Sequence, residues 1–308
     1  MARRDTSPDF IEALARGLDV IRAFQPGRPA MSLAAVAGAT GLARPTARRI
    51  LLTLEQMGYV RAVEPLDQMG HVRAVDREAV DPKAVDRRYM DRRYELTPRV
   101  LELGMSYVLS RNLWEVARPH MERLVARTHE SSSIAQLDGS DIVYVARVAV
   151  PKIVALAVTI GTRFPAMQTS LGKVLLAALS PEDAERVLAE PSRSGIPPRI
   201  VFSSEERAAS LREVRARGWA LTDEELAAGI RSVAAPLRDG EGRVIASLNV
   251  NTHAAETPVE VLTGEYLPLL LQTAGAISAD WAACQAAPQV TVPQPAGPRP
   301  APQPLALP

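Results

Sequence analysis

The stretch SLAAVAGATGLARPTARRILLTLEQMG, residues 32–58, decides the fold of the N-terminal part of the chain. Its pattern predicts a short helix over about 33–38, a tight turn at Thr40 and Gly41, and a second helix over about 44–57. The apolar residues of the second helix repeat at helical spacing: Ile50, Leu51, Leu54 and Met57. Two helices joined by a glycine-containing turn are typical of the helix-turn-helix, whose second helix enters the major groove of DNA.

The start of the second helix is basic, and its polar residues are the candidate DNA contacts: Arg44, Thr46, Arg48 and Arg49. Arginine can pair with guanine in the major groove, and Thr46 could instead bind a phosphate. The charge distribution agrees with this hypothesis, because residues 1–99 hold 17 Lys/Arg and 13 Asp/Glu, whereas residues 100–308 hold 19 and 22. A plain helical hairpin with a solvated arginine cluster is the alternative interpretation.

Length and composition set the broad class of protein. A chain of 308 residues with 47% hydrophobic residues is long enough for two folded domains. The single cysteine, Cys284, excludes an intrachain disulfide and a cysteine-based zinc site, and we expect it to be buried by helix packing. No apolar run reaches the ~18 residues that a membrane span needs, and the N-terminus MARRDTSPDF is no signal peptide. We therefore expect a cytoplasmic protein that does not contact a membrane.

The residues around the helix-turn-helix predict a winged helix. A helix with one apolar stripe is expected over 10–24, and Ser32 is expected to cap the helix that follows it. The β-prone residues at 59–61 and 94–96 could pair as the hairpin of a wing. Arg61 would then lie on the first wing strand, from which it could contact the DNA backbone.

An internal repeat interrupts the predicted wing. LEQMGYVRAV at 54–63 recurs as LDQMGHVRAV at 66–75, and the five-residue units AVDRE, AVDPK and AVDRR follow at 74–88. Because the segment is charged and poor in apolar residues, it cannot bury a core, and we predict a loop or mobile ribbon inserted at about 64–93. It is either an insertion tolerated at the wing tip or a source of arginines that extend the DNA footprint. We take the first copy as the true wing strand, because it directly continues the second helix.

The remainder of the chain predicts a connecting helix and an α+β domain. Thr97 as N-cap and Pro98 in the first turn begin an apolar helix at 98–111. Strands are predicted at 132–137, 141–148, 153–160, 219–222, 232–237 and 244–251. Helices are predicted at 113–127, 171–179, 205–217 and 257–284, and a further one begins at Pro181. The Pro-rich residues 286–308 are expected to form a disordered tail.

Several separate sequence blocks occur in the order known from one protein family. They are LDVI in the first helix, GYV after the helix-turn-helix, YELTPRVLELG, TSLGKVLLA, and GWALTDEELAAGIRSVAAPLRDGEGRVIASLNV. Over about 10–63 and 94–284 the chain resembles the IclR (isocitrate lyase regulator) family of bacterial transcription factors. Within that family, LDGSDIVYVARV, VTIGTRFPA and TSLGKVLLAAL look closest to regulators of aromatic catabolism.

The resemblance implies an α+β fold with three parts: a winged helix-turn-helix domain at 1–97, a linker helix at 98–111, and a GAF-like effector domain at 112–285. The effector domain of the family is a curved antiparallel sheet flanked by helices. The implied function is that of a transcriptional regulator, not an enzyme. It would bind double-stranded operator DNA as a homodimer or a dimer of dimers and respond to a small carboxylate effector.

The resemblance also implies an effector site, whose candidate residues are Ser170, Leu171, Gly172, Asp223, Ser232, Asn249 and Asn251. The first three begin a helix, where free backbone N–H groups favour an anion and small residues allow close approach of a ligand. Asp223 could accept a hydrogen bond from a ligand hydroxyl. Asn249 and Asn251 are spaced by two on a strand, so they should share one face.

Each of these site assignments has a plainer alternative. Ser170 and Thr169 could only cap the helix, Asn249 and Asn251 could face solvent, and Asp223 could be an exposed loop charge. Three further residues of one parity could form an apolar wall of the site: Ile153, Ala155 and Ala157.

Other chemistries find little support in the sequence. TSLGK is no phosphate-binding loop, because that motif needs glycine where Met167 stands and Ser or Thr where Val174 stands. Lys173 would then be a helix surface charge or the partner of an acidic neighbour. The four histidines form no metal-binding pair, so we expect no metal, no cofactor and no catalytic residues. A small-molecule-binding or enzymatic domain, whose helical N-terminus serves protein contacts, is the alternative function.

Overall fold

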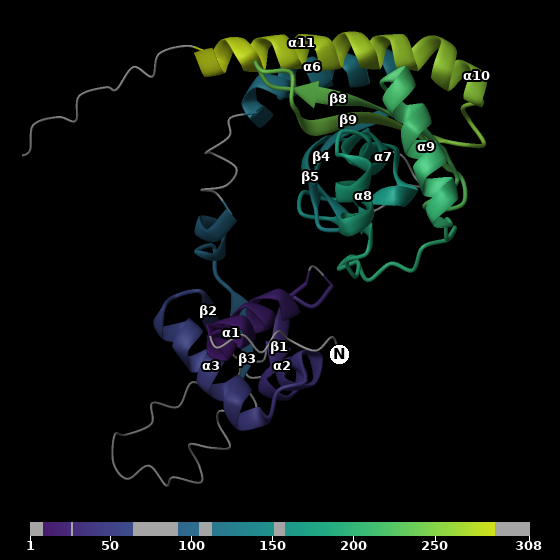
Figure 1. Cartoon of the computed structure of the whole chain (residues 1–308). Helices are drawn as coiled ribbons and strands as arrows, with labels where there is room; N and C mark the ends of the chain where they lie inside the picture. The colour runs from purple at the N-terminus through teal and green to yellow at the C-terminus, as the bar shows by residue number, and fades with distance from the viewer. Residues whose placement is uncertain (1–8, 26, 64–91, 105–112, 151–157, 287–308) are drawn as a thin grey trace, which may run out of the picture. The chain divides into compact units, whose positions relative to one another are not determined.

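The computed structural model describes five stretches of the chain, residues 9–25, 27–63, 92–104, 113–150 and 158–286. They belong to two compact units, Met1–Ser110 and Arg111–Pro308. Figure 1 shows the elements of both units, and each unit is described by itself below.

The N-terminal unit is a winged helix. Its helices are α1 (Glu12–Ala23), α2 (Leu33–Thr40) and α3 (Arg44–Gln56). Its strands are β1 (Ala30–Ser32), β2 (Val60–Val63) and β3 (Arg93–Leu96), which form an antiparallel sheet in the order β1-β3-β2. The predicted helix-turn-helix and the predicted wing hairpin are therefore confirmed, while β1 is a strand that the sequence pattern did not reveal.

Local signals set the ends of α2. Ser32 Oγ accepts a hydrogen bond from Ala35 N at 3.2 Å, which is the predicted N-cap. Gly41 ends the helix with φ of 67°, a left-handed conformation that glycine adopts without steric cost. In α3, Leu51 and Leu54 enter the core as predicted, whereas Met57 is 50% exposed.

The apolar stripe predicted on the first helix is only partly buried. Phe24 joins the core together with Val20, but Ile11, Leu14 and Leu18 are 66%, 62% and 48% exposed. Leu14 and Leu18 instead line an apolar groove. Its other walls are formed by further residues of α1, by α3 and the residues that follow it, and by Leu103; they include Ile21, Ile50, Met57 and Tyr59. The stripe is wider than the surface that α2 and α3 cover, so part of it stays accessible.

The C-terminal unit is built on one six-stranded antiparallel sheet. Its strands are β4 (Ser131–Asp138), β5 (Asp141–Val148), β6 (Arg163–Pro165), β7 (Ala220–Asp223), β8 (Ile230–Arg238) and β9 (Val244–His253), in the order β6-β5-β4-β9-β8-β7. Its helices are α6 (Leu113–Thr128), α7 (Ser170–Ala177), α8 (Pro181–Leu188), α9 (Ser204–Arg217), α10 (Val259–Val261) and α11 (Leu267–Ala286). A 3₁₀ turn, Ala166–Gln168, precedes α7, and a π-helical turn, Leu262–Tyr266, separates α10 from α11.

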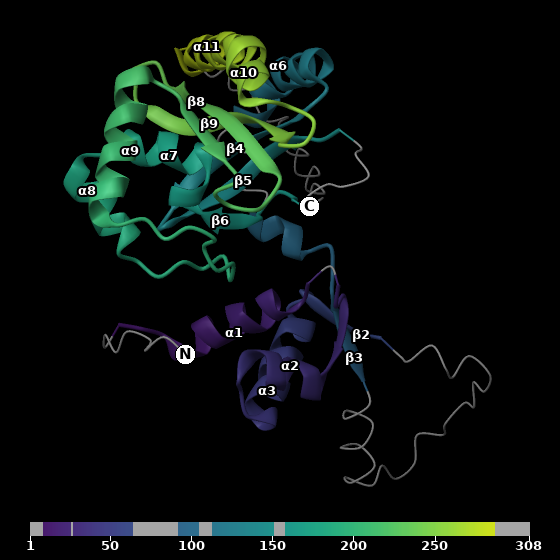
Figure 2. The ribbon, with the colours of Figure 1, turned by 90° about the vertical axis from the view of Figure 1, so that its right-hand side faces the viewer.

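Helices cover both faces of this curved sheet, as Figure 2 shows. α6 and α11 pack on one face, where Met121 and Trp281 meet sheet residues such as Leu248. α7 packs on the other face, and α8 and α9 lie outside it. All eight residues of α7 are buried, as expected for a helix that is apolar almost all round. The predicted fold class, α+β with a helix-flanked curved antiparallel sheet, is confirmed.

Several sequence-based expectations need correction or fall outside the described residues. Residues 158–160, the end of the strand predicted at 153–160, form no strand, and residues 151–157 lie outside the described part. Cys284 is exposed near the end of α11 and not buried, because this last turn extends past the sheet-covering part of the helix. Of the insertion predicted at about 64–93, residues 64–91 lie outside the described residues, and Arg93 belongs to β3. Of the tail predicted at 286–308, Ala286 is the last residue of α11, and residues 287–308 lie outside the described residues.

The predicted linker helix is described only at its start, because residues 100–104 are helical and 105–112 lie outside the described part. None of the helices in the described ranges is both long enough and apolar enough to cross a membrane.

Candidate functional site

The outer surface of α3 presents the candidate DNA contacts. Arg44 and Arg49 are exposed, and Thr46 and Arg48 are half-buried at the sides of the helix. Arg49 stands about 200° around the helix from the buried Leu51, since each residue advances by about 100°. Arg49 therefore points away from the core, whereas Arg44 is exposed because it is the first residue of the helix, and both are accessible to a partner.

Arg61 occupies a different setting on the wing. It is exposed on β2 and faces Glu95 on β3, its register partner, with which it forms an ion pair. A contact of Arg61 with a DNA phosphate would compete with this carboxylate.

The turn that follows the wing is held against the end of α3. Thr97 Oγ1 donates to the carbonyl of Gly58 at 2.5 Å and accepts from Arg99 N at 3.3 Å. Arg99 Nη1 donates to the carbonyl of Met57 at 2.7 Å, and its guanidinium lies 5.3 Å from the centre of the Tyr59 ring. Thr97 thus begins the helix as predicted and also connects it to the helix-turn-helix.

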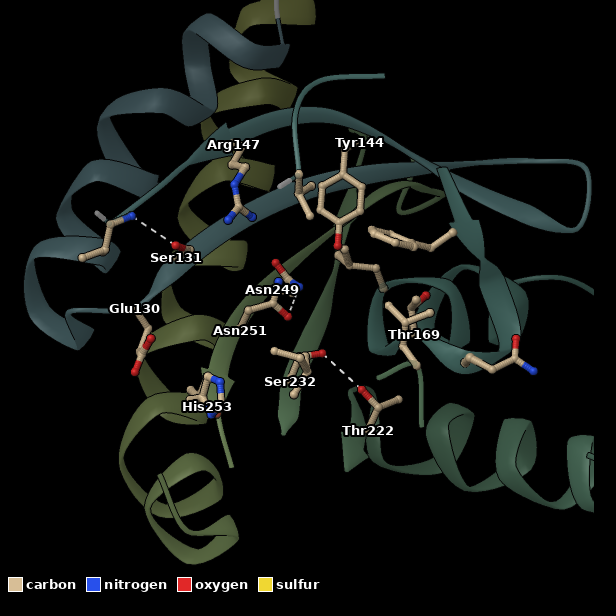
Figure 3. A pocket seen from close by; sticks show the side chains of 18 residues that line it. Glu130, Ser131, Tyr144, Arg147, Thr169, Thr222, Ser232, Asn249, Asn251 and His253 are labelled. Carbon is tan, nitrogen blue, oxygen red and sulfur yellow. Dashed lines mark hydrogen bonds between the residues drawn. The ribbon is translucent and has the colours of Figure 1, made fainter. Parts of the chain in front are cut away.

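The C-terminal unit contains a cavity lined by both polar and apolar side chains, between the sheet and the start of α7 (Figure 3). Its volume is about 70 Å³, several times the space that one water molecule needs. Its polar lining residues are Glu130, Ser131, Tyr144, Arg147, Gln168, Thr169, Thr222, Ser232, Asn249, Asn251, Thr252 and His253. Its apolar lining residues are Val150, Val158, Phe164, Leu171, Leu226 and Ile230. We refer to it as the effector cavity.

The start of α7 forms one wall of the effector cavity. Thr169 is the N-cap, and its Oγ1 accepts from Gly172 N at 3.0 Å. Ser170 does not cap the helix; its hydroxyl forms a short hydrogen bond with Ser232 Oγ on β8, which lies 3.2 Å from Thr222 Oγ1. Three hydroxyl groups from α7, β8 and β7 are therefore linked; Ser170 and Ser232 were predicted as separate effector contacts, and this link was not predicted.

Asn249 and Asn251 share one face of β9, as predicted, and that face is the cavity rather than the solvent (Figure 3). Asn249 Oδ1 accepts from Ser133 N, and Asn249 Nδ2 donates to Asn251 Oδ1, both at 3.0 Å. These hydrogen bonds fix the orientation of both amides.

Three predicted effector contacts do not line the cavity: Ser170, which is fully buried behind its hydrogen bond to Ser232, Gly172 and Asp223. Gly172 is buried against the 3₁₀ turn, where a Cβ would lie 2.1 Å from the carbonyl oxygen of Ala166. It is needed for close packing of the helix and not for approach of a ligand. Asp223 is exposed and paired with Arg231, because its neighbour Thr222 faces the cavity and successive strand residues face opposite ways.

Arg147 and Tyr144 both point into the effector cavity, which the sequence pattern did not reveal (Figure 3). A spacing of three would place them on opposite faces of a regular strand. The pairing of β4 with β5 shifts, however, so that Ala135 faces Tyr144 while Ile134 faces Ala146. This bulge at Val145 brings the side chains of Tyr144 and Arg147 to the same face.

Both side chains suit recognition of an anion. Burial raises the pKa of Tyr144 to about 12, so its hydroxyl is a neutral hydrogen-bond donor. Burial lowers the pKa of Arg147 somewhat, yet a guanidinium remains protonated at neutral pH. Arg147 Nη1 donates to Ser133 Oγ at 3.0 Å, which orients the guanidinium within the cavity. Among the described residues, the cavity therefore holds the positive charge of Arg147 together with hydroxyl and amide groups, and the carboxylate of Glu130 also lines it.

Three predicted apolar wall residues, Ile153, Ala155 and Ala157, lie outside the described residues. Thr252 was not predicted; its hydroxyl is buried at the cavity and has no hydrogen-bond partner within the described ranges. In the same part of the chain, no group of three His, Cys, Asp or Glu side chains could hold a metal ion.

Comparison with known proteins agrees with this architecture. The family model "IclR helix-turn-helix domain" matches residues 13–64, and the model "Bacterial transcriptional regulator IclR C-terminal" matches residues 105–279. The "Pca regulon regulatory protein" of Pseudomonas putida is 34% identical over 265 residues, which cover 86% of this chain and 82% of that protein.

Two solved structures are also similar. A candidate transcriptional regulator from Rhodococcus sp. RHA1 is 42% identical with a TM-score of 0.69, covering 89% of this chain and 100% of that chain. The inducer-binding domain of a double mutant of the PobR transcription factor from Acinetobacter, in complex with 3-hydroxybenzoic acid, is 29% identical with a TM-score of 0.50. That comparison covers 54% of this chain and 97% of the other.

A winged helix-turn-helix together with a second unit that contains a cavity of polar and apolar side chains is typical of a DNA-binding regulator with a ligand-binding domain. The chain belongs to the IclR family of bacterial transcriptional regulators. The expectation of a DNA-binding regulator rather than an enzyme is confirmed by this membership.

Proposed function

We propose that this protein regulates transcription of genes for aromatic catabolism in response to a small aromatic carboxylate bound in the effector cavity. The observation that carries the proposal is Arg147, the one permanent cation among the described residues that line the cavity, which stands beside the neutral hydroxyl of Tyr144. The relatives named Pca regulon regulatory protein and p-hydroxybenzoate hydroxylase transcriptional activator support the aromatic class. So does the 3-hydroxybenzoic acid bound to the PobR domain.

The two ends of the ligand would meet different groups. The carboxylate pairs with Arg147 and accepts from Tyr144, because charge-assisted hydrogen bonds are the strongest available in the cavity. The remainder of the ligand extends toward the linked hydroxyl groups of Ser170, Ser232 and Thr222. The first N–H groups of α7 lie at that end and favour any partial negative charge there.

Binding of a ring requires the cavity to open. Its volume of about 70 Å³ is smaller than the ~150 Å³ cavity in which an engineered protein holds benzene. Leu226 lies in the loop between β7 and β8, and Ile230 is the first residue after this loop. Both line the cavity. Displacement of this loop is therefore the movement that we expect on effector binding.

Arg147→Gln tests the effector assignment. Isothermal titration of the full-length protein with 3-hydroxybenzoate and 4-hydroxybenzoate should give binding in the wild type and a loss of at least about tenfold in the variant, the equivalent of ~1.4 kcal/mol. Arg212→Gln is the matched control, because Arg212 is exposed on α9 and does not line the cavity. Equal affinities of all three proteins would contradict the assignment of Arg147.

On the DNA side, we propose Arg44, Thr46, Arg48, Arg49 and Arg61 as the residues that contact an operator. The exposed positions of Arg44, Arg49 and Arg61 support this assignment. A helix-turn-helix dimer places its two recognition helices in successive major grooves, so the functional form would be a homodimer or a dimer of dimers.

The part of the apolar groove formed by Leu14, Leu18 and Leu103 is the surface that we assign to a second copy of the chain, whereas Thr46 and Arg49, which also line the groove, are left to the DNA. Leu14, Leu18 and Leu103 are 62%, 48% and 53% exposed along it, and a two-fold axis would bury the same residues of both copies. Leu14→Asp with Leu18→Asp should shift the full-length protein toward a lower mass in analytical ultracentrifugation and weaken operator binding. Leu271→Asp on α11 is the control at an exposed leucine outside the groove.

A further inference from the structure

Two neighbouring serines of β4, Ser132 and Ser133, are fully buried, and their hydroxyl groups have different partners. Ser132 Oγ donates to the carbonyl of Asn249 at 2.7 Å. Ser133 Oγ accepts from Arg147 Nη1 at 3.0 Å. Neither serine lines the effector cavity, but Ser133 connects β4 to the guanidinium that points into it (Figure 3).

The main chain of Ser133 is held on both sides within the sheet. Ser133 pairs in register with Arg147 on β5 and with Asn249 on β9. Its main-chain N–H donates to Asn249 Oδ1 at 3.0 Å, while its hydroxyl bonds with Arg147. Because the first of these bonds does not involve the Ser133 side chain, a substitution of Ser133 can remove the contact with Arg147 alone.

The guanidinium of Arg147 keeps further donors for a ligand. A guanidinium carries several N–H groups in a planar fork that matches a carboxylate, and the bond with Ser133 uses one of them. Burial lowers the pKa of Arg147 and Tyr144 raises it, whereas no carboxylate among the described residues contributes. Glu130, which also lines the cavity, is therefore not the partner that orients Arg147.

A long side chain that a ligand must first immobilise binds more weakly than one that is already fixed. We propose that Ser133 is a positioning residue of the effector site, whose hydroxyl fixes Arg147 in the direction of the effector carboxylate before the effector binds. Ser133 itself does not touch the effector. The inference rests on the proposed function of the effector cavity.

Ligand-observed NMR titrations of the full-length protein with 3-hydroxybenzoate test this role. Ser133→Ala should lower the affinity about fivefold, because binding must then also immobilise the guanidinium. Ser132→Ala is the matched control, since it removes an equally buried hydroxyl that does not contact Arg147. Its affinity should stay within about twofold of the wild type. A loss as large in Ser132→Ala as in Ser133→Ala would overturn the proposal.

A double-mutant cycle separates positioning from a general structural effect. In an Arg147→Met background no guanidinium remains to be positioned, so Ser133→Ala should change the affinity by less than about twofold. Equal losses from Ser133→Ala in both backgrounds would mean that the hydroxyl acts on the structure of the site, and would overturn the proposal. If Arg147→Met binds too weakly for the cycle, the comparison with Ser132→Ala decides.

Failure of the effector assignment and failure of the role of Ser133 give different results. A wild type that binds neither 3-hydroxybenzoate nor 4-hydroxybenzoate contradicts the proposed function. Binding to the wild type without a loss in Ser133→Ala contradicts only the role of Ser133. If Ser133→Ala fails to fold, as judged by circular dichroism, Ser133→Cys replaces it, because a thiol is a weak acceptor and should give a similar loss.

Discussion

Lys173 Nζ lies 2.7 Å from Glu225 Oε2, and this ion pair is buried between α7 and the loop that follows β7. The Lys173 side chain is 6% exposed and that of Glu225 is 16% exposed, and the ammonium also lies 5.3 Å from the centre of the Phe202 ring. The sequence left open whether Lys173 is a surface charge or pairs with an acidic neighbour, and the structure shows that it pairs with Glu225.

The position of this pair matters for the effector cavity. Glu225 precedes Leu226, which lines the cavity, and Glu224 beside it adopts φ of 56°, an uncommon conformation for a non-glycine residue. Gly229 N donates to Glu224 Oε2 at 2.8 Å, which closes the loop on itself. The Lys173–Glu225 pair therefore holds in place the loop that we propose a ring-sized effector displaces.

Removal of one partner of this pair should be destabilising. Lys173→Met leaves Glu225 as an unpaired, largely buried carboxylate, and we expect the free energy of unfolding to fall by about 3–5 kcal/mol. Lys173→Met combined with Glu225→Leu replaces both charges and should recover most of the loss. Urea unfolding of the three proteins measures the effect. A double variant no more stable than Lys173→Met would show that the loss comes from packing and not from the unpaired charge.

Gly172→Ala should also be destabilising, although alanine usually favours a helix. A Cβ at this position would lie 2.1 Å from the carbonyl oxygen of Ala166, so the 3₁₀ turn must move, at a cost of about 1–3 kcal/mol. Gly275→Ala on α11 is the matched control, because no atom lies within 4 Å of the added Cβ there. We expect the control to gain about 0.5–1 kcal/mol from helix propensity. Thermal unfolding of both variants distinguishes the packing effect from the propensity effect.

The raised pKa of Tyr144 predicts a loss of stability at high pH. The folded value is about 12, whereas the ordinary value is 10.0, because burial disfavours the phenolate. Between these two values the unfolded chain loses the proton and the folded chain keeps it, so stability falls as the pH rises through this window. In Tyr144→Phe this decline should disappear. Urea unfolding at a series of pH values measures it, and the same slope in both proteins would contradict the assignment.

Loss of the arginines of α3 should weaken DNA binding. Arg48→Ala with Arg49→Ala should reduce affinity for the DNA upstream of the protein's own gene, by about 1–3 kcal/mol for each arginine that pairs with a guanine. Because Arg48 is half-buried, Arg49→Ala alone separates DNA contact from any effect on folding. Fluorescence anisotropy at several salt concentrations measures the change, and a lost phosphate contact would lower the salt slope by about one.

The control for this experiment is Arg212→Ala, which removes an exposed arginine of the C-terminal unit. An affinity of Arg49→Ala equal to that of the control would exclude Arg49 as a DNA contact. Effector binding should be the same in all these variants, because Arg48 and Arg49 lie in the other unit.

The sequence by itself determined the elements whose signals are local. Ser32, Ser180 and Ser203 cap the helices that were predicted to follow them, and Ser203 forms the complete capping box with Glu206. The hairpin of β4 and β5 turns at Asp138-Gly139, between the two strands predicted at 132–137 and 141–148. Such signals act over three or four residues, so they are readable from the order of residues alone.

Only the tertiary structure decided which side chains meet at the effector cavity. A bulge at Val145, which depends on the pairing of β5 with β4, brings Arg147 to the side of Tyr144. The burial of Lys173 depends likewise on α8, α9 and a distant loop that close over α7. Asp223 and Gly172 looked suitable by residue type but lie outside the cavity, because strand parity and helix packing direct them elsewhere. These outcomes depend on contacts between residues far apart in the chain, which no local pattern encodes.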